Sequence, residues 1–103
     1  MLQYSSRIVR NTLIASAALL TLSAHAQSTV KVGLLSTLSG PGAGLGVDIR
    51  DGFKLAVKLN GGKLGGQAAE VIVADDQASP DVGRQTADRL VKRDKVDFMT
   101  GVV

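Results

Sequence analysis

The residues best suited to chemistry in this chain are two adjacent carboxylates, Asp75 and Asp76, which follow an apolar run. Paired carboxylates share acid and base work when both side chains reach the same reacting group. Adjacent residues at the end of a strand point to opposite sides of the sheet, which disfavours such sharing. The pattern therefore favours a capping or hinge role for the two residues over catalysis.

A second candidate is the glycine-rich segment after the first apolar run, with glycines at positions 40, 42, 44 and 46. Such a loop between a strand and a helix can bind the pyrophosphate of a dinucleotide in an oxidoreductase. The fingerprint G-x-G-x-x-G is absent, because its last position is Leu45 when counted from Gly40 and Val47 when counted from Gly42. Asp75 also lies much farther along the chain than the roughly 20 residues expected for the ribose-binding acid. A dinucleotide-binding oxidoreductase is therefore an alternative that the spacing disfavours.

Other chemistries lack the necessary side chains. The chain has no cysteine and a single histidine, His25, so we expect no metal site and no base for a hydrolase nucleophile. No glycine pattern leads to Gly-Lys-Ser/Thr, which excludes a P-loop. The 12 Lys and Arg are scattered among 9 Asp and Glu, without the basic aromatic stripe of a nucleic-acid surface. We expect no enzyme activity, no cofactor and no nucleic-acid partner.

Residues 1–26 are typical of a secretory signal peptide. Two arginines, Arg7 and Arg10, precede an apolar stretch at residues 12–22, and Ala24-His25-Ala26 fits a peptidase site. The apolar stretch is well short of the roughly 20 residues that a membrane-spanning helix needs. We predict cleavage after Ala26 and export to the periplasm of a Gram-negative cell. Without cysteines, the exported part must fold around a hydrophobic core rather than a disulfide framework.

The rest of the chain alternates apolar runs with helical patterns. Three apolar runs predict strands, at residues 30–35, 69–74 and 96–103. Apolar residues at helical spacing predict a first helix from about Gly46 to Asn60, with Asp48 in its first turn. Phe53 and Met99 are expected in the core by the same patterns.

The second helix is predicted to begin at Ser79, whose side chain can cap free amides. Pro80 suits the first helical position, and Asp81 complements the positive end of the helix dipole. Three basic residues are expected in its last turn, namely Lys92, Arg93 and Lys95. The order β-α-β-α-β predicts an α/β fold that starts an open parallel sheet with right-handed crossovers.

Open sheets of this kind bind ligands outside the carboxyl ends of their strands, which directs attention to residues 36–47 and 75–79. Ser39-Gly40-Pro41-Gly42 is most simply a strand-to-helix turn, although the hydroxyl of Ser39 can also hydrogen-bond a ligand. The free amides at the start of the first helix would favour an anion, but Asp48 is expected to satisfy them.

The motifs, taken in order, resemble the opening of the branched-chain amino acid binding proteins, which have the type 1 periplasmic-binding fold. Four segments carry the resemblance: residues 31–41, Gly46 with Gly52, residues 60–66 and residues 75–80. The resemblance implies that residues 27–103 form the N-terminal part of the first lobe, about half of its sheet. It also implies a monomeric two-lobed protein that closes around an amino acid or a similar small carboxylate and delivers it to an ABC permease.

The resemblance also places one ligand contact. In the family, the residue before Gly46 is often aromatic and flanks the ligand, and here that residue is Leu45. The family's main contacts in this lobe lie beyond Val103, and the run that ends in Val102-Val103 has no polar tail, so we expect a truncated chain. A ligand-binding domain of a receptor or sensor with the same fold is a further alternative.

Overall fold

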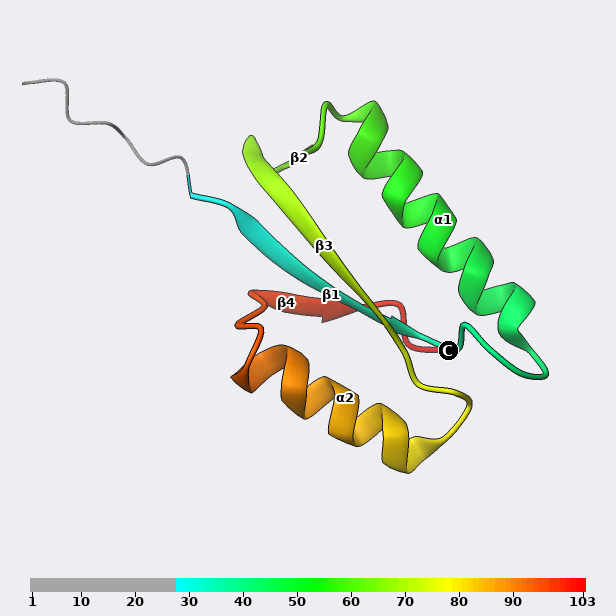
Figure 1. The fold of residues 1–103 in the computed structure, drawn as a ribbon. Helices are drawn as coiled ribbons and strands as arrows, with labels where there is room; N and C mark the ends of the chain where they lie inside the picture. Colours follow the sequence, from blue (N-terminus) through cyan, green and yellow to red (C-terminus); the bar gives the residue numbers. More distant parts are fainter. Residues whose placement is uncertain (1–27) are drawn as a thin grey trace, which may run out of the picture.

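The structure of this protein is a computed structural model that describes residues 28–103. The predicted signal peptide and its cleavage site lie outside the described residues. The elements follow in the order β1 (Val30–Ser36), α1 (Ala43–Leu59), β2 (Lys63–Leu64), β3 (Gln67–Asp75), α2 (Pro80–Lys92) and β4 (Phe98–Thr100). The sheet runs between the two helices, with α1 on one side and α2 on the other (Figure 1).

The sheet has the strand order β2-β3-β1-β4, and β1 pairs in parallel with both β3 and β4. The predicted α/β fold, with helices crossing between parallel strands, is therefore confirmed. The sheet is not parallel throughout, because β2 pairs with β3 in an antiparallel hairpin. Gly65 and Gly66 connect them with φ angles of 56° and 78°, and positive φ at both central positions is what a type I′ hairpin turn requires.

Helix α1 begins at Ala43, earlier than the predicted start at Gly46. The turn before the helix leads straight into it, because Gly42 has a φ of 88° and the Ala43 amide donates to the Gly40 carbonyl at 3.2 Å. The earlier start moves Asp48 out of the first turn, which contains no acidic residue. The expectation that Asp48 neutralises this helix end is therefore wrong.

Helix α2 starts as predicted, with the side chain of Ser79 accepting a hydrogen bond from the Val82 amide and Pro80 in the first position. Its end differs from the prediction. Lys92 is in the last turn as predicted, together with Arg89, whereas Arg93 is the C-cap residue and Lys95 lies past the helix with a φ of 57°.

The core is built on the central strand β1, where Val32 and Leu34 are fully buried. Leu35 forms a cluster with Ala74 and Leu90, and Met99 packs against it as predicted. Phe53 is only half-buried, so the prediction that it lies in the core is confirmed only in part. The last strand is shorter than the predicted run, and Val102 behind it is 72% exposed. Neither helix in residues 28–103 is long and apolar enough to span a bilayer.

Candidate functional site

The carboxyl ends of β1 and β3 lie next to each other, because the parallel register pairs Ser36 with Asp75. The pairing continues one residue further, where the Asp76 amide donates to the Ser36 carbonyl at 3.0 Å. The connection from β1 to α1 and the connection from β3 to α2 therefore leave the sheet at the same edge. Since ligands of open α/β sheets bind at this edge, we take it as the candidate site and call it the carboxyl edge.

Asp75 ties the two connections together. Its Oδ1 accepts hydrogen bonds from the Leu38 amide at 2.9 Å and from the Gln77 amide at 2.8 Å, and its Oδ2 accepts one from Ser39 Oγ at 2.6 Å. The Ser39 hydroxyl first, and the two amides after it, lower the pKa of Asp75 below its ordinary value. The carboxylate is therefore ionised at neutral pH and acts as an acceptor only.

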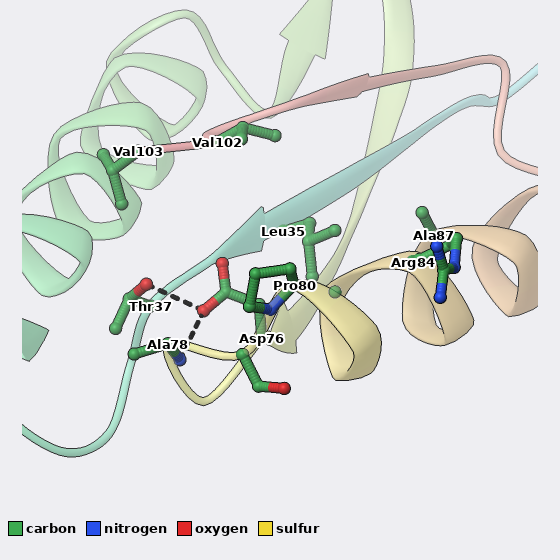
Figure 2. A pocket seen from close by; sticks show the side chains of 11 residues that line it. Leu35, Thr37, Asp76, Ala78, Pro80, Arg84, Ala87, Val102 and Val103 are labelled. Atoms are coloured by element: carbon green, nitrogen blue, oxygen red, sulfur yellow. Dashed lines mark hydrogen bonds between the residues drawn. The ribbon is translucent and has the colours of Figure 1, made fainter.

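Asp76 has a separate set of partners. Its Oδ1 accepts hydrogen bonds from Thr37 Oγ1 at 2.7 Å and from the Ala78 amide at 2.9 Å (Figure 2). The two neighbouring carboxylates thus hold different loop groups, and each also binds the amide two residues on, as an Asx turn does. This arrangement fits the capping role expected from the sequence, because each carboxylate holds its own loop groups.

Gly46 lets α1 sit directly on the end of β1. A Cβ at this position would lie 1.8 Å from the carbonyl oxygen of Thr37 and 3.0 Å from Ser36 Oγ. No side chain fits such a gap, since real Cβ atoms do not approach backbone that closely. The close contact fixes the first turns of α1, and with them Leu45, against the carboxyl edge.

The two predicted ligand contacts, Ser39 and Leu45, both lie in the segment that follows β1. Ser39 is exposed, and its hydroxyl proton is directed to Asp75. Leu45 is in the first turn of α1 with 60% of its surface exposed. Their contact with a ligand remains a prediction. The sequence reasoning missed Thr37, whose only signal was a hydroxyl residue directly after a buried strand.

A cavity of about 540 Å³ opens beside the carboxyl edge, on the α2 side (Figure 2). Thr37, Asp76, Ser79 and Arg84 supply polar atoms to its wall. Apolar side chains complete the lining, among them Leu35, Ala87, Val102 and Val103. The described segment contains no group of three residues able to hold a metal ion. The cavity therefore offers hydrogen bonding, apolar contact and the charges of Asp76 and Arg84.

The model of the family described as periplasmic binding protein matches residues 29–103. No curated protein matches the chain.

Solved structures share the fold. The solute-binding protein of an ABC transporter from R. palustris, in complex with benzoate, is 37% identical with a TM-score of 0.69, over 74% of this chain and 21% of that chain. One from Rhodopseudomonas palustris BisB5, in complex with 3,4-dihydroxybenzoic acid, is 38% identical with a TM-score of 0.65, over 69% and 20%. A possible leucine/isoleucine/valine-binding protein from Rhodopirellula baltica SH 1 is 26% identical with a TM-score of 0.63, over 74% and 21%. The chain thus spans about a fifth of the length of these relatives.

Proposed function

Because this chain belongs to the periplasmic binding protein family, we propose that the complete protein is the solute-binding component of an ABC importer. It works in the periplasm as a monomer, captures a small carboxylate between two lobes and delivers it to the permease. It carries out no catalysis. The observation that carries this proposal is the family match, which spans residues 29–103 and so nearly the whole described part of the chain.

The ligand class follows from the relatives and from Leu45. Two relatives, at 37% and 38% identity, hold benzoate and 3,4-dihydroxybenzoic acid, whereas the leucine/isoleucine/valine type is 26% identical. An aromatic carboxylate is therefore placed ahead of a branched-chain amino acid. Leu45, 60% exposed at the carboxyl edge, offers an aliphatic surface for the ring of such a ligand.

In this proposal, Ser39 and Leu45 are the ligand contacts that residues 28–103 supply. The remaining contacts come from other parts of the complete protein. Ligand contacts in both lobes favour the closed arrangement over the open one. The carboxyl edge suits this task because Asp75 and Asp76 fix both connections before a ligand arrives. Pre-ordered loops lose less entropy on binding than mobile ones.

A thermal-shift screen of the complete mature protein tests this function. The probes are benzoate, 4-hydroxybenzoate, leucine and NAD. A ligand that binds only the folded state raises the melting temperature by mass action, and a shift of several degrees is expected with a benzoate at 100 times its Kd. A shift with NAD alone would contradict the proposal and favour the oxidoreductase.

A further inference from the structure

The hydrogen bond between Ser39 and Asp75 has a fixed direction. A serine hydroxyl has one proton and two lone pairs, whereas an ionised carboxylate has only lone pairs. Ser39 must therefore be the donor in the 2.6 Å contact with Asp75 Oδ2, a length typical of a hydroxyl bonded to a carboxylate. The single proton of Ser39 is used inside the protein.

Asp75 stays ionised, so it continues to accept the proton of Ser39 in this hydrogen bond. The Leu38 and Gln77 amides, which can only donate, both bind its Oδ1 and stabilise the ionised form. The lowered pKa of Asp75 agrees with this geometry. Ser39 therefore presents only lone pairs to the solvent, and the negative charge of Asp75 lies directly behind them.

We propose that Ser39, held by Asp75, is a specificity-determining residue that accepts a hydrogen bond from a hydroxyl or ammonium group of the ligand. This inference rests on the proposed function, since it assigns chemistry to the same edge. A ligand carboxylate is itself an acceptor and gains nothing from lone pairs that face it. Ser39 thus selects carboxylates that carry a second, hydrogen-donating group, and it holds that group rather than the carboxylate.

Two matched pairs of probes show whether the group that donates to Ser39 is a hydroxyl or an ammonium. 4-Hydroxybenzoate differs from benzoate by one hydroxyl, and leucine differs from 4-methylpentanoate by one ammonium. Calorimetric titration of the complete mature protein with all four gives a preference ratio for each pair. At least one ratio is expected to favour the donor-bearing probe, by about fivefold to tenfold for the neutral hydroxyl and by more for the charged ammonium.

Ser39→Ala is expected to bring that ratio close to one, because the acceptor is lost. Ser28→Ala is the matched control, since Ser28 is an exposed serine before β1, at the opposite end of the strand. The control should keep the native ratio.

Asp75→Asn tests the direction of the hydrogen bond. The amide oxygen can still accept from Leu38 and Gln77, while the amide nitrogen donates to Ser39 Oγ and turns the serine proton outward. The preference for the donor-bearing probe should fall, although less far than in Ser39→Ala, because Ser39 Oγ now accepts one hydrogen bond internally and keeps only one lone pair for the ligand. Asp81→Asn, which removes a more exposed charge from the first turn of α2, should keep the native ratio.

The outcomes separate this inference from the function beneath it. Binding of the carboxylates with ratios that neither Ser39→Ala nor Asp75→Asn alters would overturn the role of Ser39 and leave the transport function standing. Equal loss of affinity for both members of each pair would do the same, since it indicates a structural role. Failure of the native protein to bind any carboxylate would overturn both.

Discussion

Helix α2 is started by side chains of its own sequence, whereas helix α1 is started by its fit against the end of β1. Ser79 caps α2, with its Oγ 3.4 Å from the Val82 amide, and Asp81 lies in the first turn. No side chain caps α1, its first turn has no acidic residue, and Gly46 rests on the Thr37 carbonyl. Leu45, one residue before Gly46, therefore takes its position from the contact of α1 with the end of β1 as well as from the turn at Gly40 and Gly42.

The largest effect is expected from Gly46→Ala, which would break the fit of α1 on β1. The added methyl would lie 1.8 Å from the Thr37 carbonyl oxygen, so the helix must move away. We expect the free energy of unfolding of the complete protein to fall by about 3 kcal/mol or more, measured by urea denaturation.

Gly44→Ala is the matched control, two residues earlier in the same helix, where an added Cβ meets nothing within 4 Å. It should leave stability unchanged or raise it by up to about 1 kcal/mol, since alanine is the better helix former. Similar losses in both variants would mean that the contact with Thr37 is not what starts α1.

A smaller, pH-dependent effect is expected from Asp75→Asn, because Asp75 joins the loops that lead into the two helices. Its pKa is lowered in the fold, so the ionised carboxylate stabilises the protein at pH values above the ordinary value of 3.8. That stabilisation is lost as the pH falls through the lowered folded value. Urea denaturation at pH 7 and pH 3 should therefore show a gap between native and variant that narrows in acid. A gap of equal size at both pH values would contradict this link.

Ser79→Ala sharpens the comparison from the side of α2. The cap is local and its hydrogen bond is long, so the loss in unfolding free energy should be about 0.5–1 kcal/mol. Ser79→Asp, which keeps an acceptor, should recover the loss. If Ser79→Ala costs as much as Gly46→Ala, then α2 also depends on long-range packing and the contrast between the helices fails.

The smallest effect is expected from Asp81→Asn. The ion pair of Asp81 with Arg84 has a length of 2.7 Å, but both side chains are close to 80% exposed. Such pairs contribute about 0.5 kcal/mol or less, and added salt should remove the difference. A salt-independent loss above 1 kcal/mol would show that Asp81 acts through more than this pair.

The contrast between the starts of α1 and α2 also explains which features could be predicted from the sequence. The start of α2 was predicted because Ser79, Pro80 and Asp81 act within one turn. The start of α1 was placed at Gly46 rather than at Ala43, and the role of Gly46 was missed because it depends on Thr37 in the loop after β1. The β2 hairpin was also missed, since two residues are too few to show strand periodicity.

At the candidate site, the sequence predicted which residues matter but not how they meet. Ser39 and Asp75 were singled out separately, and their hydrogen bond joins residues 36 apart in the chain. It exists because β1 and β3 pair in parallel with Ser36 opposite Asp75. Periodicity gives neither strand order nor register, so the acceptor-only character of Ser39 could not be derived before the structure.

Gly46 also constrains any redesign of the complete protein as a biosensor. A library that randomises residues 39–46 would lose most of its members at Gly46, because every side chain meets the Thr37 carbonyl there. Leu45 is exposed and its neighbour Gly44 has open space above it, so both tolerate diversity. A library that varies Leu45 and Ser39 while keeping Gly46 fixed would therefore test changes in ligand preference among variants that keep the contact between α1 and the end of β1.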